Sequence, residues 1–198
     1  YWRRDYFPEY KHSRRKSRDT SDKNWDIIFN CLNTIKEEVK ANMPYKSVEV
    51  YGAEADDIIA TLCSESSDEV MILSGDKDFI QLQKFPNVKQ YSPITKKMIN
   101  GINPDDYLME HVLKGDTSDG VPNVLSPDNT FVDGIRQRPL SKKKIALMVE
   151  GDFPNDEIKR NYQRNKKLID LDCAPDELRF EILDTYKSAP VNDRSKIL

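Results

Sequence analysis

The chain has 198 residues, of which 37% are hydrophobic, and its formal net charge is −3; this length suits one domain, or one domain with an appendage, and it is enough to bury a core. No apolar run approaches the ~20 residues needed to cross a bilayer and no signal-peptide pattern opens the chain, so we expect a cytoplasmic protein with no membrane partner. The three cysteines, odd in number and far apart, and only two histidines argue against a disulfide framework and against the usual type of zinc site.

Basic residues gather at the start of the chain. Residues 1–18 carry seven Lys or Arg against two acidic residues, so the remaining 180 residues carry a net charge of −8. Residues 1–22 are basic and aromatic without a clean period, which predicts an arm that is mobile or ordered by a partner. Its cations offer phosphate contacts and its aromatic rings offer stacking surfaces for unpaired bases, although a solvated charge run is the ordinary alternative. The candidate nucleic-acid contacts in the arm are Arg3, Arg4, Lys11, Arg14, Arg15 and Lys16.

A helix is predicted over residues 24–42, with Ser21 or Asp22 as its cap and Pro44 after its end. Its apolar residues hold the i, i+3, i+4, i+7 rhythm of one buried face: Trp25, Ile28, Phe29, Leu32, Ile35 and Val39. Cys31 falls on this stripe, so we expect it to be a reduced core thiol.

The next segment alternates strands and helices. SVEVY, residues 47–51, predicts a short strand, and Gly52 separates it from a helix over residues 53–66 that turns Cys63 inward. EVMILS, residues 69–74, is apolar almost throughout, as expected for a parallel strand that is covered on both faces.

Helices dominate the rest of the chain. Residues 88–99 predict a hairpin, residues 103–116 predict a helix capped by Asn103, and residues 120–140 are rich in turn formers. Two or three helices follow, over residues 141–150, 155–170 and 175–187. The pattern predicts an α/β fold, with a central, mainly parallel sheet flanked by helices and a helical C-terminal part.

Three acidic clusters interrupt this pattern. Glu54–Asp57 begins the second predicted helix, Asp76 and Asp78 follow the apolar strand, and Asp116 and Asp119 lie one helical turn apart. Each cluster has an ordinary explanation, because acidic residues in a first turn favour the helix dipole and Asp and Gly are common in turns.

Taken together, the three clusters predict a metal site. Ligands of an open parallel sheet collect outside the carboxyl ends of its strands, where the first two clusters lie. Carboxylates at this density repel one another unless a cation neutralises them, and Lys77 is the one cation within the first two clusters. Oxygen ligands suit Mg²⁺ or Mn²⁺. Two such ions ~4 Å apart can activate water and stabilise the attacking and leaving oxygens of a phosphodiester.

Other hydrolases have less support in the sequence. No G-x-x-x-x-G-K-[ST], G-x-S-x-G or H-E-x-x-H motif is present. The D-x-D and GDTSDG segments also resemble phosphatases of the haloacid dehalogenase type. Phe79 stands where those enzymes have Thr or Val, and the basic arm would have no role in them.

Three motifs resemble the structure-specific 5′ nucleases, a family of flap endonucleases, 5′-nuclease domains of bacterial DNA polymerases and phage 5′ exonucleases. They are GAEADDIIATL, ILSGDKDFIQL and LKGDTSDGVPNV, in this order and at this spacing. YWRRDYFPEYKHSR and FPNVKQYSP look most like the RNase H of T-even-type phages, which is a flap endonuclease by mechanism. The resemblance covers most of residues 1–125 and is looser past Pro127.

The resemblance implies a PIN-like 5′-nuclease fold and metal-dependent hydrolysis at the 5′ ends of branched or flapped DNA and RNA–DNA, as in primer removal. The implied cofactor is Mg²⁺ in two sites, with Mn²⁺ able to substitute. The implied setting is the cytoplasm of a phage-infected cell, where a monomer would work with single-strand-binding or replication-fork proteins.

Motif positions also imply roles for individual residues. The implied ligands are Glu54, Asp56, Asp76 and Asp78 for the catalytic ions, Asp116 and Asp119 for the second metal, and Asp57 as an outer ligand. Lys11 and Arg14 stand where the family has cations of a helical arch that approach the scissile phosphate, and they join Asp76 and Asp78 as catalytic candidates. A helix-hairpin-helix-like element begins at GDTSDGVPNV, beyond which Lys142, Lys143 and Lys144 are either phosphate contacts or a solvated helix end.

The resemblance divides the chain into three parts. Residues 1–22 form a basic arm within the arch, residues 23–115 form the nuclease core without its N-terminal strands, and residues 116–198 bind duplex. Two upstream metal aspartates of the family have no counterpart here, and the chain begins without Met. We therefore expect a fragment of the enzyme, and the alternative is a nucleic-acid-binding piece without catalysis.

Overall fold

The computed structural model describes residues 1–193. The predicted C-terminal part therefore extends past the described residues at 194–198, and the side chain of Arg15, a predicted nucleic-acid contact, also lies outside the described part. The α-helices are α1 (Trp2–Tyr6), α2 (His12–Asp19), α3 (Trp25–Asn42), α4 (Ala55–Glu65), α5 (Pro104–Lys114), α6 (Lys142–Val149), α7 (Asp156–Ile169) and α8 (Asp176–Ser188). The strands are β1 (Val70–Leu73), β2 (Val88–Ser92) and β3 (Lys97–Ile99), and the 3₁₀ helices are η1 (Lys77–Lys84) and η2 (Leu171–Cys173).

The sheet is small and mixed, in the order β1-β2-β3. β1 runs parallel to β2, with Val70 opposite Val88, and β2 runs antiparallel to β3, with Gln90 opposite Ile99. The predicted apolar strand and the predicted hairpin are both present. Parallel pairing is limited to β1 and β2 among the described strands, so the expectation of a mainly parallel sheet overstated its extent.

Residues 47–51 do not form the predicted strand. Val50 is buried, whereas Tyr51 is 97% exposed. The alternating pattern thus reflects an extended segment with a buried anchor, because a β-strand also requires a neighbouring backbone with which to form its ladder.

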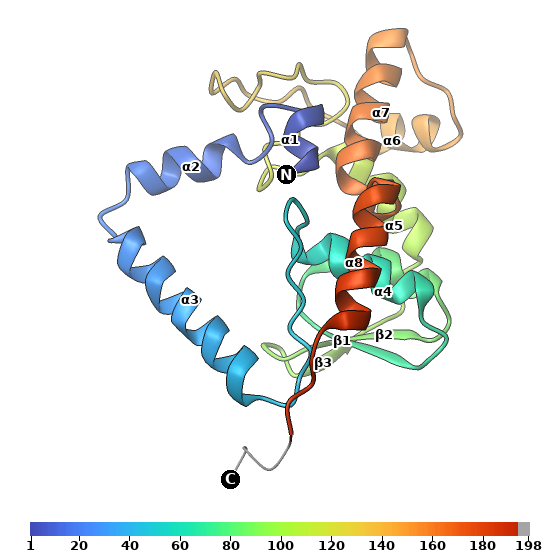
Figure 1. Ribbon diagram of the computed structural model, residues 1–198. Coiled ribbons are helices and arrows are strands. Elements are labelled where there is room, and N and C mark those ends of the chain that lie inside the picture. Colours follow the sequence, from blue (N-terminus) through green and yellow to red (C-terminus); the bar gives the residue numbers. More distant parts are fainter. Residues whose placement is uncertain (194–198) are drawn as a thin grey trace.

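The main apolar core lies between the sheet and α4. Its buried members include Ala60 and Cys63 of α4, Ile72 of β1 and Phe79 of η1, and Leu171 closes it from the C-terminal region. α8 lies beside α4 (Figure 1). This packing fixes the N-terminus of α4 and the end of β1, which carry the first two acidic clusters.

The N-terminal segment is ordered against the body, contrary to the predicted mobile arm. Phe7 and Tyr10 are buried with Val112, Val121 and Leu168 in a second apolar cluster. Hydrophobic periodicity does not detect this arrangement, because α1 has only five residues. The buried residues Phe7 and Tyr10 follow α1 and contact segments that are distant in sequence.

The predicted helix over residues 24–42 is confirmed as α3, although Asn24, not Ser21 or Asp22, caps it by accepting a hydrogen bond from the Ile27 amide. The predicted burial of its apolar face is wrong. No residue of α3, all of which are described, is buried, and Cys31 is exposed. α2 and α3 project from the body and return to it through residues 43–53 (Figure 1). An apolar stripe indicates that burial of that face is favourable, but the tertiary fold determines whether another element packs against it.

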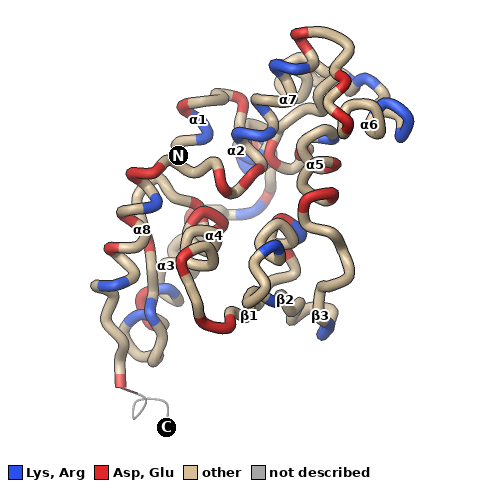
Figure 2. Tube along the Cα trace, turned by 90° about the vertical axis from the view of Figure 1, so that its right-hand side faces the viewer, with Lys and Arg blue, Asp and Glu red and all other residues tan. Residues whose placement is uncertain are grey.

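The C-terminal part is helical, as predicted. α5 begins with the Asn103 side chain accepting hydrogen bonds from the amides of Asp105 and Asp106, and α6, α7 and α8 agree with the three expected helices within a few residues. Lys142, Lys143 and Lys144 are exposed in the first turn of α6, and α6 lies at the outer edge of this part of the molecule (Figure 2). No described helix is both long and apolar enough to span a lipid bilayer.

An ion-pair cluster joins the loop after α5 to α7. Arg160 donates two hydrogen bonds to Asp128, at 2.7 and 2.9 Å, and Arg164, whose side chain is 4% exposed, pairs with the same carboxylate. Burial acts to raise the pKa of Asp128, but the hydrogen bonds and charges of the two arginines outweigh burial and lower that pKa below its usual value.

The Asp128→Asn variant is therefore expected to lose about 1–2 kcal/mol of unfolding free energy at pH 7. The value is below that of a fully buried pair because the Asp128 side chain is 40% exposed. A carboxylate whose pKa is lowered in the folded state stabilises the protein at pH values above its unfolded pKa of ~3.9. The difference in stability between the variant and the wild type should therefore shrink as the pH falls below 4. Urea titrations at pH 7 and pH 3 measure it. Asp133→Asn, in the same loop, is the control, and a difference that stays constant with pH would contradict the expectation.

Candidate active site

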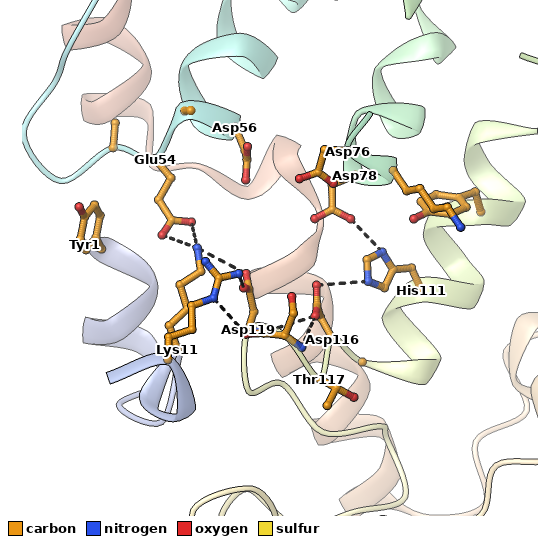
Figure 3. A pocket seen from close by; sticks show the side chains of 17 residues that line it. Tyr1, Lys11, Glu54, Asp56, Asp76, Asp78, His111, Asp116, Thr117 and Asp119 are labelled. Atoms are coloured by element: carbon orange, nitrogen blue, oxygen red, sulfur yellow. Dashed lines mark hydrogen bonds and ion pairs between the residues drawn. The ribbon is translucent and has the colours of Figure 1, made fainter. Parts of the chain in front are cut away.

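Side chains from all three acidic clusters surround one cavity of ≈ 710 Å³. Its acidic lining consists of Glu54, Asp56, Asp76, Asp78, Asp116 and Asp119, and Figure 3 shows these carboxylates facing a common space. The predicted convergence of the three clusters is therefore confirmed. The metal-binding roles of the individual residues remain predictions at this point.

Local backbone geometry positions each cluster. Glu54 is the N-cap of α4 and forms a reciprocal capping box with Asp57. Asp76 is the N-cap of η1 and accepts a hydrogen bond from the Asp78 amide at 3.1 Å. Asp116 Oδ1 accepts hydrogen bonds from the amides of Ser118 and Asp119, at 2.7 and 3.2 Å. Helix N-termini and turn amides thus hold the carboxylates in fixed directions, since both favour negative charge.

A close backbone contact fixes the third cluster. Gly115 has φ +69°, and a Cβ atom on it would lie 2.4 Å from the Val121 carbonyl oxygen. Asp116 and Val121 form an isolated antiparallel bridge. Only glycine tolerates this approach and this φ, so Gly115 sets where Asp116 leaves α5.

Asp57, the predicted outer ligand, does not line the cavity. Its side chain is fully buried beside Arg3, whose own side chain is 2% exposed. Arg3 Nη1 lies 3.0 Å and Nη2 2.8 Å from the Asp57 oxygens, and Arg3 Nε donates to the Leu168 carbonyl at 2.9 Å. Arg3 therefore anchors α1 inside the protein and has almost no exposed side-chain surface with which to contact nucleic acid.

Two further cations of the arm do enter the cavity. Lys11 Nζ lies 2.6 and 2.7 Å from the two Glu54 oxygens and 3.5 Å from Asp119, with which Arg14 also pairs. Tyr10 donates its hydroxyl proton toward this group, with Oη 2.8 Å from Asp119 and 3.0 Å from Glu54. The sequence shows only Lys77 as a cation within the first two clusters. The cations of the arm could not be added from sequence, because their pairs with the carboxylates join segments at least 43 residues apart. Arg4 and Lys16 are exposed and line no part of this cavity.

The carboxylates disturb one another's protonation. Burial, followed by the negative charges of Asp76 and Glu54, raises the pKa of Asp56 to about 6. Burial also raises the pKa of Asp78 to about 6, with Asp76 and Asp116 adding to the rise and His111 opposing it. Negative charge is therefore in excess at this end of the cavity even with Lys11 and Arg14 present.

Two further residues that line the cavity, Tyr107 and His111 of α5, were not among the predicted site residues. His111 Nδ1 lies 3.3 Å from Asp78 Oδ1 and its Nε2 lies 3.7 Å from Asp116 Oδ2. Burial lowers the pKa of His111, but the nearby carboxylates of Asp116 and Asp78 outweigh it and raise the pKa above its usual value. Their i, i+4 spacing, one helical turn before Gly115, is the signal that would have pointed to this face of α5.

The donor set fits divalent cations. One ligand atom each from Asp78, His111 and Asp116 lie within 4.8 Å of one another. Glu54, Asp56 and Asp76 add carboxylate oxygens in the same cavity. A divalent ion would offset both the burial and the mutual repulsion that raise the pKa values of Asp56 and Asp78, so residues and electrostatics both suit a metal.

Known proteins resemble this chain in sequence and in fold. Residues 1–111 match the family model described as 5′-3′ exonuclease, N-terminal resolvase-like domain, and residues 103–198 match the model described as T4 RNase H, C terminal. Ribonuclease H of Enterobacteria phage T4 is 36% identical over 211 residues, covering 100% of this chain and 69% of that protein. The flap endonuclease Xni of Shewanella sp. strain MR-4 is 28% identical over 134 residues, covering 62% of this chain and 48% of that protein.

A solved structure supports the same fold. The bacteriophage T5 flap endonuclease, in a pseudo-enzyme–product complex with DNA and metal ions, superposes with a TM-score of 0.63 at 18% identity. The superposition covers 94% of this chain and 80% of that one. The predicted fold class is thereby confirmed as the resolvase-like 5′-nuclease fold, here with a small sheet and a helical C-terminal part. The chain belongs to the 5′-3′ exonuclease and flap endonuclease family, whose named members are nucleases that hydrolyse phosphodiester bonds.

Proposed function

We propose that this chain cleaves phosphodiester bonds at the 5′ ends of branched DNA or RNA–DNA, as a flap endonuclease and 5′-3′ exonuclease that uses Mg²⁺. The observation that carries the proposal is the meeting of six carboxylates with Lys11 and Arg14 in one cavity. Family membership supports the reaction class, and the DNA in the T5 complex supports the substrate class.

The acidic and basic residues of the cavity would have different roles. Glu54, Asp56 and Asp76 offer hard oxygen ligands, which favour Mg²⁺. Divalent ions bound there would supply positive charge to the phosphoryl oxygens and lower the pKa of the attacking water. Lys11 and Arg14, which lie against Glu54 and Asp119, are placed to contact the scissile phosphate and stabilise the charge that develops on it.

The rest of the chain would hold the substrate. The α2–α3 projection, with its exposed aromatic and basic side chains, forms the arch through which a single 5′ strand can pass. Residues 1–22, the basic arm, supply part of this arch and α3 supplies the rest. We assign the remainder of residues 23–115 to the nuclease core and residues 116–198 to duplex binding. Lys142, Lys143 and Lys144, all exposed on α6, are the proposed phosphate contacts on the duplex side.

A cleavage assay tests the proposal. The chain is incubated with a 5′-labelled flap on a nicked duplex, with the same flap made of RNA, and with a blunt duplex, each in Mg²⁺ or EDTA. We expect Mg²⁺-dependent products mapped to the branch point of both flaps, and little product from the blunt duplex. A gel shift of the flap without cleavage would support the alternative, a nucleic-acid-binding piece without catalysis. Cleavage in EDTA would contradict the metal mechanism.

Lys11→Ala and Arg14→Ala are each expected to slow flap cleavage by about 10²-fold, because each removes a positive charge beside the reacting phosphate. Binding of the flap should weaken far less, since many other cations contact the backbone. Single-turnover rates and gel-shift titrations separate the two effects. Lys97→Ala, on the exposed strand β3 and outside the cavity lining, is the control. Equal losses in rate and affinity would assign these residues to binding alone.

A further inference from the structure

His111 introduces nitrogen chemistry into a cavity whose other candidate ligands are oxygens. Its ring lies between Asp78 and Asp116, with Nδ1 3.3 Å from one carboxylate and Nε2 3.7 Å from the other. The chain has two histidines, and the other, His12, is exposed on α2 and does not line the cavity. The imidazole at this place therefore needs its own explanation.

The surroundings of His111 differ from those of a core histidine. Its Nδ1 is buried and has no hydrogen-bond partner among the described residues, because the short approach to Asp78 lacks hydrogen-bond geometry. A buried ring nitrogen without a partner is costly, so such atoms usually have a ligand or a water. The ring belongs to none of the described apolar clusters and packs edge-on against Tyr107, with centroids 5.6 Å apart. That contact holds the nitrogens toward the cavity.

The spacing of the three side chains suits a shared ion. Ligand atoms that bind one metal at 2.0–2.2 Å lie about 3.0–3.6 Å from each other in octahedral or tetrahedral arrangements. Candidate atoms of Asp78, His111 and Asp116 lie within 4.8 Å of one another, so small side-chain rotations bring them to that spacing.

We propose that Asp78, His111 and Asp116 form a mixed nitrogen–oxygen metal site that prefers transition metals such as Mn²⁺ over Mg²⁺. Imidazole nitrogen binds first-row transition metals well, whereas Mg²⁺ is held almost wholly by oxygen ligands. Glu54, Asp56 and Asp76 remain an all-oxygen group, so the cavity would contain two sites of different metal preference. The inference rests on the proposed metal-dependent function and specifies which ions its two sites take.

Pulsed EPR of the Mn²⁺-loaded chain tests the nitrogen ligand directly, without measuring activity. We expect ¹⁴N modulation from a coordinated imidazole in the wild type and in His12→Gln, and its loss in His111→Gln. Titrations followed by EPR and by calorimetry should show that His111→Gln weakens the tightest Mn²⁺ binding about 10-fold or more and leaves Mg²⁺ binding within about 3-fold. Circular dichroism checks folding. Because the wild-type spectrum itself must contain the nitrogen signal, a misfolded variant does not protect the proposal.

The outcomes separate this inference from the proposed function. Mn²⁺ that binds without ¹⁴N modulation, or with modulation that survives in His111→Gln, overturns the mixed site, even if flap cleavage proceeds. Equal losses of Mn²⁺ and Mg²⁺ affinity in His111→Gln would also overturn it, because they would indicate a structural role. Nitrogen-coordinated Mn²⁺ in a chain that cleaves no flap would support the site and contradict the nuclease.

Discussion

Asp76→Asn is expected to slow flap cleavage by about 10³-fold or more while leaving the fold intact. Asp76 has two functions that this substitution separates. It caps η1 by accepting a hydrogen bond from the Asp78 amide, and it contributes a negative charge to the cavity. Asparagine caps helices about as well as aspartate, so the local structure should survive. Loss of one anionic ligand should cost about 4 kcal/mol of transition-state stabilisation, and each 1.36 kcal/mol is a factor of ten in rate.

A matched control for this variant exists in the same chain. Asp170 also caps a 3₁₀ helix, η2, by accepting a hydrogen bond from the amide two residues later, at 3.0 Å. It does not line the cavity. Single-turnover rates on a 5′ flap, with thermal melts of both variants, should show the loss for Asp76→Asn and a near-normal rate for Asp170→Asn. An Asp76→Asn protein that cleaves at the wild-type rate would remove this cavity from the mechanism.

Arg3→Met is expected to lower the free energy of unfolding by about 3–5 kcal/mol. Both partners of the Arg3–Asp57 pair are buried, and removing one charge leaves the other without compensation in a medium that solvates it poorly. Asp57 would keep its hydrogen bond from the Glu54 amide, at 2.9 Å, but would lose the cation. Urea unfolding measures the loss. Arg4→Met, at the exposed neighbouring position on α1, should change stability by less than about 0.5 kcal/mol.

A double variant identifies the cause of that loss. Arg3→Met combined with Asp57→Asn removes both charges, so it should be more stable than Arg3→Met alone. If the double variant is instead as unstable as the sum of the two single variants, packing of the arginine stem explains the effect. The pair also matters for the cavity, because Arg3 precedes Tyr10 and Lys11 on the segment that it anchors. Loss of this anchor should therefore reduce cleavage before the protein unfolds.

Local order could be predicted from the sequence because its causes are local. The apolar run of β1, the Asn103 cap of α5 and the period of α3 each depend on residues within a few positions of one another. The meeting of the first two acidic clusters could also be predicted, since helix starts and strand ends meet at one edge of a sheet. The third cluster follows the C-terminal end of α5, and this rule does not place it. The sequence of this protein thus determined helices α3 to α8, the three strands and the acidic lining of the cavity, whereas α1 and α2 were not predicted and the expected strand at residues 47–51 did not form.

Only the tertiary structure decided how charges pair and which faces are covered. Arg3 meets Asp57 across 54 residues, Lys11 meets Glu54 across 43, and Tyr10 meets Asp119 across 109. His111 enters the cavity because α5 packs on η1. The α3 stripe has the pattern of a buried face and stays exposed. The physical reason is that a local pattern records what a side chain favours, whereas its partner is chosen by packing between segments that are distant in sequence.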